Sequence, residues 1–160
     1  MKINLSSEHT DAQFIHDKLY AYNCLKTGKE PQKISLDPLP GRAVLLLDDE
    51  KEDDEEEKKE KEEGKRLGGL VWHLSGERGE IFEIEFLWVS DACRGKGAGS
   101  ALLREAETIA KQHSCTCLKL FTNTFQAPDF YRKAGFTLTK SEPDPAIPWN
   151  TRFYFERELV

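Results

Sequence analysis

Several segments of the chain are rich in the apolar, β-branched and aromatic residues that are typical of β-strands. Strands are predicted at residues 2–5, 41–47, 67–74, 80–89, 117–122, 136–140 and 151–159. Strict alternation in the segment 80–89 predicts that one face of this strand carries Glu83, Glu85, Leu87 and Val89. The opposite face is then expected to carry Ile84, Phe86 and Trp88.

Apolar residues at helical spacing predict helices between these strands. The first helix has an apolar face made of Phe14, Ile15, Leu19, Tyr22 and Leu25. It is expected to end at Gly28. A second helix carries Leu102, Leu103, Ala106, Ile109 and Ala110, and a short third helix is predicted at 128–133. Strands outnumber helices, and no internal repeat is visible.

The charge of the chain is concentrated in one segment. Residues 48–66 hold 12 acidic and 6 basic residues, whereas the rest of the chain holds 17 of each sign. This segment has no apolar side chain, so no burial can offset the entropy that it would lose on becoming ordered. We therefore expect a flexible loop. Electrostatic attraction of a cationic substrate is the functional alternative.

Composition narrows the class of protein. A chain of 160 residues is expected to form a single domain, here 1–160. The neutral remainder offers no basic stripe for nucleic acid, so no nucleic-acid partner is expected. The N-terminus lacks the apolar core of a signal peptide, and no segment has the length and apolarity needed to span a bilayer. We therefore expect a cytoplasmic protein with no membrane partner.

The four cysteines, Cys24, Cys93, Cys115 and Cys117, are expected to be reduced, because the cytoplasm is a reducing compartment. Cys115 and Cys117 alternate on a predicted strand and would share a face. No second pair or histidine cluster completes a zinc-like ligand set, so no metal site is predicted.

The segment 94–100 places three glycines directly before the second long helix. Glycines let the backbone approach a ligand closely, and the free amides at a helix start point toward a bound anion. The spacing does not match a P-loop, and Ser100 stands where a dinucleotide loop would need glycine. The segment is therefore predicted to bind a phosphate or pyrophosphate group through a loop of another type.

The spacing Arg94-x-x-Gly97-x-Gly99, directly after a strand that ends in Leu87-Trp88-Val89, resembles the acyl-CoA signature of the GNAT superfamily of N-acyltransferases. A second signature of that family is similar to Asn123, Ala127, Phe130, Tyr131, Gly135 and Phe136. Together the two signatures cover about half of the chain. One departure is that Asn123 precedes Ala127 by four residues, where three is commoner.

This resemblance implies an α+β fold with a mixed, mostly antiparallel sheet, flanked by helices on both faces and splayed near Val89. It implies an N-acetyltransferase that moves an acetyl group from acetyl-CoA to a primary amine by direct attack. The residues that match the acetyl-CoA site are Leu87, Trp88, Val89, Arg94, Gly95, Lys96, Gly97, Ala98, Gly99, Ser100, Asn123 and Tyr131. The amide of Val89 would also polarise the thioester carbonyl.

The catalytic residues that the resemblance implies are an acid and a base. Tyr131 matches the residue that protonates the leaving thiolate, a role that suits a tyrosine hydroxyl. Glu83 and Glu85 are the candidate bases, because they would share a face with Leu87 and Val89, and Glu83 is preferred. Their alternative roles are a core aromatic for Tyr131 and solvated or strand-pairing carboxylates for the two acids.

The acceptor amine is left open by the sequence. A small molecule such as a polyamine or an amino sugar is favoured, and a protein N-terminus or lysine is the alternative. The loop 141–150, with Glu142, Asp144 and Trp149, would bind the amine or serve as a rigid proline-rich connector. A sensor that binds acetyl-CoA without turnover is a further alternative, and a homodimer is compatible with the sequence.

Overall fold

The structure is a computed structural model that describes residues 1–49 and 66–160. Of the acidic loop predicted at 48–66, residues 50–65 lie outside the described residues. The strands of the described chain are β1 (Lys2–Ser6), β2 (Ala43–Asp48), β3 (Arg66–Ser75), β4 (Ile81–Val89), β5 (Cys117–Asn123), β6 (Thr137–Pro143) and β7 (Thr151–Glu158). The helical segments are α1 (His9–Thr27), the short 3₁₀ turn η2 (Asp91–Cys93), α3 (Ala98–Gln112) and α4 (Pro128–Lys133).

The described strands form one sheet in the order β1-β2-β3-β4-β5-β7-β6. Neighbouring strands are antiparallel except β4 and β5, which are parallel. A parallel pair needs a crossover, and α3 supplies it between β4 and β5. The predicted mixed and mostly antiparallel α+β fold is therefore confirmed.

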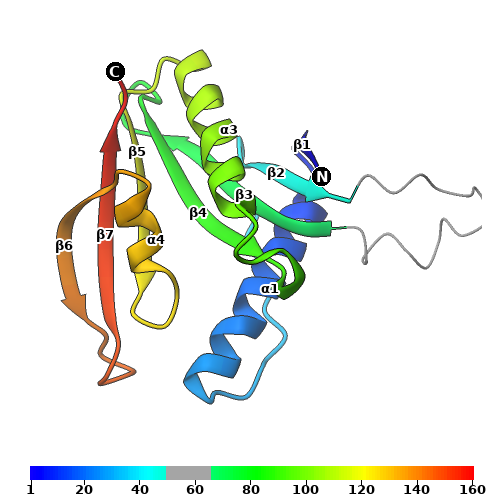
Figure 1. Cartoon of the computed structure of the whole chain (residues 1–160), viewed down its shortest axis with the longest axis vertical. Coiled ribbons are helices and arrows are strands. Elements are labelled where there is room, and N and C mark those ends of the chain that lie inside the picture. The colour runs from blue at the N-terminus through cyan, green and yellow to red at the C-terminus, as the bar shows by residue number, and fades with distance from the viewer. Residues whose placement is uncertain (50–65) are drawn as a thin grey trace, which may run out of the picture.

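Helices cover both faces of the sheet. Figure 1 shows α3 in front of the strands and α1 behind them. The alternation along β2 explains this arrangement, because Leu45 and Leu47 belong to the core under α3 whereas Val44 and Leu46 belong to the core under α1. The strand is apolar on both faces because both faces are buried.

A glycine on β3 lets α1 approach the sheet closely. A Cβ atom added to Gly69 would lie 2.5 Å from Cδ1 of Ile15 and 3.0 Å from the carbonyl oxygen of Leu45. Ile15 itself is fully buried. Any side chain at position 69 would therefore push α1 away from the strands.

Strands β4 and β5 separate along their length. Their pairing joins Ile81–Glu83 to Cys117–Lys119 and stops there. Beyond this point the two strands diverge, as Figure 1 shows, and a wedge opens between them. The predicted splay toward Val89 is confirmed.

Strand β4 contains one more residue than β3 in the paired region. Ile84 lies opposite Trp72, whereas Phe86 lies opposite Val71, so Glu85 is the extra residue of a β-bulge. Leu87 consequently packs into the same core as Ile84, the one under α3. The alternation predicted for 80–89 is wrong beyond Ile84, because a bulge shifts the two-residue period by one.

Candidate active site

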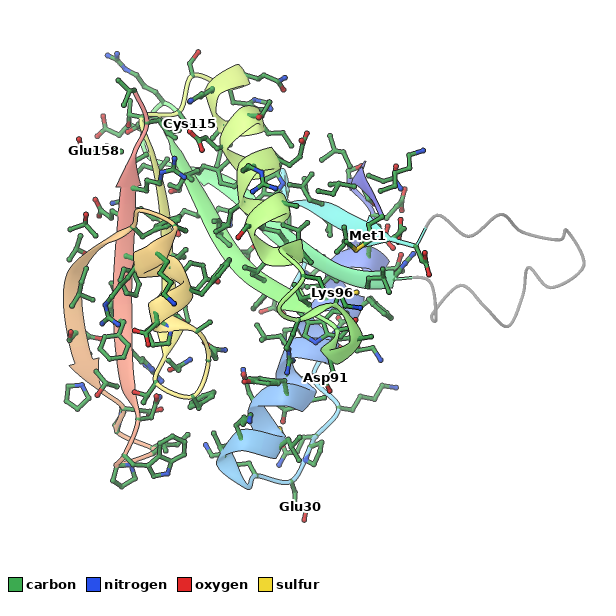
Figure 2. The ribbon with its side chains drawn as sticks, viewed as in Figure 1. Met1, Glu30, Asp91, Lys96, Cys115 and Glu158 are labelled. Carbon is green, nitrogen blue, oxygen red and sulfur yellow. The ribbon has the colours of Figure 1, made fainter. Side chains whose placement is uncertain are left out.

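The wedge between β4 and β5 is a cleft of about 660 Å³. One end is lined by the residues of the glycine loop and the first turn of α3, and the walls come from α1, the two strands and α4. Figure 2 shows the side chains around this opening, with Asp91 and Lys96 on the loop that leads into α3. The fold thus brings together residues that lie about a hundred positions apart in the chain.

The glycine loop adopts the conformation that an anion site requires. Gly95 and Gly97 have φ angles of 74° and 78°, in the left-handed region that favours glycine. Gly97 is the residue that precedes the first turn of α3, and a Cβ added there would meet no atom within 4 Å. The amides that follow have no acceptor within the helix, and Ala98, Gly99 and Ser100 line the cleft.

The loop also carries two charged side chains, Arg94 and Lys96, which lie in different surroundings. Arg94 lies 2.5 Å from Asp91 as an ion pair, and its guanidinium stands 4.8 Å from the centre of the Tyr22 ring. Lys96 is exposed and is not among the residues that line the cleft. A role for Lys96 at the site would therefore have to use its backbone.

The open edge of β4 forms a second feature of the cleft. Leu87, Trp88 and Val89 pair through β3 on one side, opposite Leu70, Gly69 and Gly68. On the other side the described strands leave them without a partner, because β5 pairs only as far as Glu83. An extended ligand could pair with this edge as an added strand. The Trp88 ring points to α1, with its centre 6.3 Å from that of Phe14.

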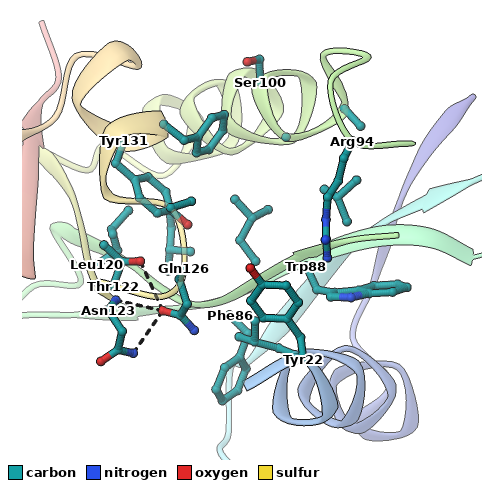
Figure 3. A pocket seen from close by; sticks show the side chains of 18 of the residues that line it. Tyr22, Phe86, Trp88, Arg94, Ser100, Leu120, Thr122, Asn123, Gln126 and Tyr131 are labelled. Carbon is teal, nitrogen blue, oxygen red and sulfur yellow. Dashed lines mark hydrogen bonds between the residues drawn. The ribbon is translucent and has the colours of Figure 1, made fainter. Parts of the chain in front are cut away.

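Tyr131 projects from α4 into the cleft, and Figure 3 shows its hydroxyl directed into the opening. The ring is buried and packs against Phe130, Phe136 and Phe155, with centroids 5.1, 5.8 and 6.2 Å away. Burial raises the pKa of Tyr131 above its ordinary value, because the charged form would lose its hydration. The hydroxyl therefore stays protonated at neutral pH and can act as a proton donor.

Glu85 reaches the cleft from the bulge and is held by two basic side chains. The Arg42 guanidinium forms a fork with its carboxylate, with Nε 2.8 Å from Oε2 and Nη2 2.9 Å from Oε1. His73 Nδ1 lies 3.2 Å from Oε2. Burial opposes ionisation of this carboxyl, but the hydrogen bonds and charge of Arg42, with His73 close by, outweigh it and lower the pKa of Glu85.

Glu83 lies outside the cleft. Its carboxylate accepts a hydrogen bond from the Ser75 hydroxyl at 3.0 Å, and it is not a lining residue. It precedes the bulge, so it faces away from the side that carries Leu87 and Val89. The prediction that Glu83 shares a face with Leu87 and Val89 is therefore wrong, because the bulge at Glu85 shifts the two-residue period by one.

Asn123 lines the cleft as part of an amide network that sequence reasoning missed. Its Nδ2 donates to Gln126 Oε1 at 3.1 Å, and its Oδ1 accepts from the fully buried Asn150 at 2.8 Å. Gln126 in turn donates to Asn23 Oδ1 on α1 at 3.0 Å. The only signal in the sequence is that all four are amides, and their spacing does not connect them.

Tyr22 is a further lining residue that was predicted only as part of a helix face. Its hydroxyl donates to the carbonyl of Phe125 at 3.2 Å. Figure 3 shows its ring on the side of the cleft opposite Tyr131. Together with the contact between Gln126 and Asn23, this bond connects α1 to the loop after β5 across one side of the cleft.

The predicted acceptor loop contributes little to the lining. Glu142 pairs with Lys140 and accepts from the Tyr154 hydroxyl at 3.1 Å. Asp144 is buried and accepts from Asn150 at 3.0 Å and from the amide of Ala146 at 2.9 Å, contacts that lower its pKa. Trp149 packs edge-on against Phe125 at 5.8 Å. None of the three acceptor-loop residues lines the cleft.

Two further properties bear on the site. Within residues 1–49 and 66–160, no group of three or more histidine, cysteine or acidic side chains is placed to hold a metal ion. In the same parts of the chain, no helix combines the length and apolarity needed to cross a membrane.

Comparison with known proteins places this geometry in a family. A family model described as the acetyltransferase (GNAT) family matches residues 35–136. The blasticidin-S acetyltransferase of Streptomyces morookaense is 38% identical over 84 residues, which are 52% of this chain and 60% of that protein. The chain therefore matches less than two thirds of the length of this curated relative.

Solved structures share the fold. An acetyltransferase from Bacillus cereus ATCC 14579 aligns with 96% of this chain and 95% of its own, at 28% identity and a TM-score of 0.59. A protein described as a streptothricin acetyltransferase, from Bacillus anthracis str. Ames and in complex with acetyl coenzyme A, aligns with 76% of this chain and 64% of its own, at 18% identity and a TM-score of 0.58. The family match, the splayed sheet and the glycine loop at the start of α3 agree, and the chain belongs to the GNAT family of acetyltransferases.

Proposed function

We propose that this chain transfers the acetyl group of acetyl-CoA to a primary amine of a small molecule. The observation that carries the proposal is a single cleft with a free helix start at one end and a protonated, buried tyrosine on its wall. The relative named for acetylating an antibiotic and the structural neighbour in complex with acetyl coenzyme A support it.

The cleft has the groups that acetyl-CoA would need. The amides from Gly97 to Ser100 would hold the pyrophosphate, since they lie at a helix start and the glycines leave room for close approach. The Lys96 amide already donates to the carbonyl of Cys93 at 3.4 Å. The open edge of β4 at Leu87 and Val89 would pair with the pantetheine arm. The side chain of Asn123 is already bonded to Gln126 and Asn150, so we assign it the role of shaping the wall.

Acetyl-CoA would supply the acetyl group as a thioester, so that transfer forms a carbon–nitrogen bond and breaks a carbon–sulfur bond. The amide of Val89 would donate to the carbonyl oxygen, where negative charge develops. Tyr131 would give its proton to the departing sulfur and recover one from solvent. These roles follow the residues that the sequence matches to the family.

The proton of the amine needs an acceptor, and the geometry favours Glu85 over Glu83. Glu85 lines the cleft and is ionised at neutral pH, whereas Glu83 is bonded to Ser75 outside it. A carboxylate with a lowered pKa is a weak base, so Glu85 would act chiefly by attracting the ammonium ion and accepting its proton through water. We therefore propose Glu85 as the carboxylate that attracts the amine and accepts its proton before attack.

The walls of the cleft favour a small acceptor over a protein segment. Tyr22 and Asn23 of α1 are hydrogen-bonded to Phe125 and Gln126 across one side. A polypeptide lying over this side would have to break both contacts before its amine entered. A small molecule needs only the remaining opening.

Isothermal titration with acetyl-CoA tests the proposal, with Ser100→Glu as the decisive variant. Glutamate suits the first turn of a helix, so the fold should be retained or slightly stabilised. Its negative charge beside the pyrophosphate should weaken acetyl-CoA binding about 100-fold. Ser100→Gln has the same size without the charge and should bind within about threefold of the wild type, since no charge is added.

The outcomes separate charge from shape. If the glutamine and glutamate variants lose the same affinity for acetyl-CoA, the size of the side chain and not its charge causes the loss. That result would give no support to an anion site at this end of the cleft. Absence of saturable binding by the folded wild-type protein would refute the proposed function.

A further inference from the structure

We propose that the acceptor is a monoamine that carries an aromatic or heteroaromatic ring, and that polyamines and amino sugars are poor substrates. The inference rests on the proposed function and narrows its substrate class. It follows from the charges, the ring faces and the hydrogen-bond groups that the cleft presents.

Charge in the cleft does not suit a polycation. Of the described residues that line it, only Glu85 and Arg94 are charged. Glu85 already accepts the Arg42 fork and lies 3.2 Å from His73 Nδ1. A second or third ammonium group brought into the cleft would have no free carboxylate there, and an unpaired buried charge is strongly disfavoured.

Cations of the protein already occupy the ring faces where an additional ammonium could dock. The Arg94 guanidinium lies 4.8 Å and the Lys26 ammonium 5.5 Å from the centre of the Tyr22 ring. Lys18 lies 6.0 Å from the centre of the Trp88 ring. Cation–π attraction at Tyr22 and Trp88 is therefore already used by the protein, and these charges repel a polycation.

The amide side chains on one wall of the cleft, Asn23, Asn123 and Gln126, are bonded to one another. The Gln126 carbonyl oxygen accepts from Thr122 at 3.2 Å and from Asn123 at 3.1 Å, and its amide donates to Asn23 at 3.0 Å. A sugar brings several hydroxyls that lose water on entry and need replacement partners. Because these amides are already committed, the cleft would leave such hydroxyls unsatisfied.

The cleft is rich in aromatic side chains, which present flat apolar faces. Its aromatic lining consists of Tyr22, Phe86, Trp88, Phe121, Phe130 and Tyr131. Phe86 and Tyr22 both lie on the side of the cleft away from Tyr131 in Figure 3. Phe121 is 54% exposed, so its ring has contact area to spare. An aromatic ring attached to a single amine would bury its faces against the rings that carry no cation, such as Phe86 and Phe121, while the amine reaches Glu85.

The test compares four amines with the purified full chain and saturating acetyl-CoA. 2-Phenylethylamine is matched to 2-cyclohexylethylamine, and spermidine and glucosamine represent the two excluded classes. Thiol release gives kcat/KM, expressed per unprotonated amine. We expect 2-phenylethylamine to exceed its cyclohexyl analogue roughly fivefold and the other two amines roughly 100-fold.

Phe86→Leu assigns the preference to a residue, because it keeps an apolar side chain and removes the ring face. The ratio of phenyl to cyclohexyl substrate should fall to about 1, since ring stacking supplies the difference. Phe14→Leu is the matched control, since Phe14 also packs on the α1 side of the sheet but does not line the cleft. It should keep the wild-type ratio.

Each outcome decides between the two ideas. Spermidine or glucosamine turned over as well as the aromatic amine overturns this inference and leaves the proposed function standing. Failure to bind acetyl-CoA removes the proposed function itself. If acetyl-CoA binds but no amine reacts, titration of the four amines into protein loaded with coenzyme A decides, and lack of preference for the ring overturns the inference.

Discussion

Glu85 shows how one inserted residue changes the chemistry of a strand. Without the bulge, Glu83 would share a face with Leu87, and it would be the candidate base. With the bulge, Glu85 lines the cleft between Arg42 and His73, and Glu83 turns to Ser75. β-bulges commonly re-aim side chains next to active sites in this way.

Glu85→Gln should lower kcat/KM about tenfold through loss of the charge that attracts the ammonium ion. Glu83→Gln should change it less than about twofold, because that side chain is outside the cleft and carries no assigned role. Glu85 is already ionised at neutral pH, so the rise in rate between about pH 6 and 9 should follow the amine and persist in the variant. A rise that disappears in Glu85→Gln would make Glu85 the titrating base.

The free energy of unfolding should also depend on the ionisation of Glu85. Folding lowers the pKa of Glu85 from its ordinary value of 4.5, so its ionised form stabilises the protein above that value. This contribution is lost as the pH falls through the folded-state pKa, below 4.5. Glu85→Gln should cost about 1.5–3 kcal/mol at neutral pH, and denaturant titrations should show the difference shrinking in acid.

Tyr131→Phe should lower kcat about 100-fold and leave acetyl-CoA binding unchanged. The described residues give its hydroxyl no hydrogen bond, so little stability should be lost when the oxygen is removed. Tyr154→Phe, which removes a hydroxyl bonded to Glu142 away from the cleft, is the control and should keep full activity. Unchanged kcat in Tyr131→Phe would exclude the tyrosine as the acid.

At the scale of elements, the position of α1 relative to the sheet sets one wall of the cleft, the wall proposed to face the acceptor. Its Ile15 packs against Gly69, and Tyr22 and Asn23, further along the same helix, reach across to the loop after β5. Because a helix moves as a rigid unit, a shift at Ile15 is transmitted to the cleft. The fit between one glycine and one isoleucine therefore bears on substrate binding.

Gly69→Ala should destabilise the fold by about 1–3 kcal/mol and raise KM for the amine, because the added methyl group collides with Ile15. Ile15→Val removes Cδ1, the atom that would be struck, and by itself should cost about 0.5–1.5 kcal/mol. The double variant should be more stable than the sum of the single effects. Additive losses in denaturant unfolding would show that the two residues do not compete for space.

At the scale of the molecule, the sheet consists of an N-terminal group of strands, β1 to β4, and a C-terminal group, β5 to β7. They are joined by a short parallel pairing between β4 and β5. The helix α3 crosses between the groups and starts at the cleft. The glycine-loop end of the cleft, Tyr131 and the wall formed by α1 therefore come from different parts of the chain.

The acidic segment can be removed as a whole-molecule test. Asp48 of β2 lies opposite Arg66 of β3, so the ends of the segment are adjacent in the sheet. Replacing residues 50–65 by Asn-Gly, which favours a tight hairpin turn, should preserve cooperative thermal unfolding and acetyl-CoA binding. A product that fails to fold would show that the segment contributes to the core.

The sequence by itself determined the features that arise from local periodicity and turn chemistry. Alternation placed the strands, and helical spacing placed α1 and α3. Glycines before α3 and after α4 marked the loop that begins α3 and the end of the helix that carries Tyr131. Each of these depends on residues within a few positions of one another, so each can be read along the chain.

The tertiary structure alone decided the features that depend on register and long-range contact. The bulge at Glu85 arises where Trp72 and Val71 of another strand meet β4. The contact from Asn23 to Gln126 and the bond from Tyr22 to Phe125 join residues that are 103 positions apart. Sequence periodicity carries no information about which residues will face each other across such distances, so the wall of the cleft that joins α1 to the loop after β5 forms only when the sheet is assembled.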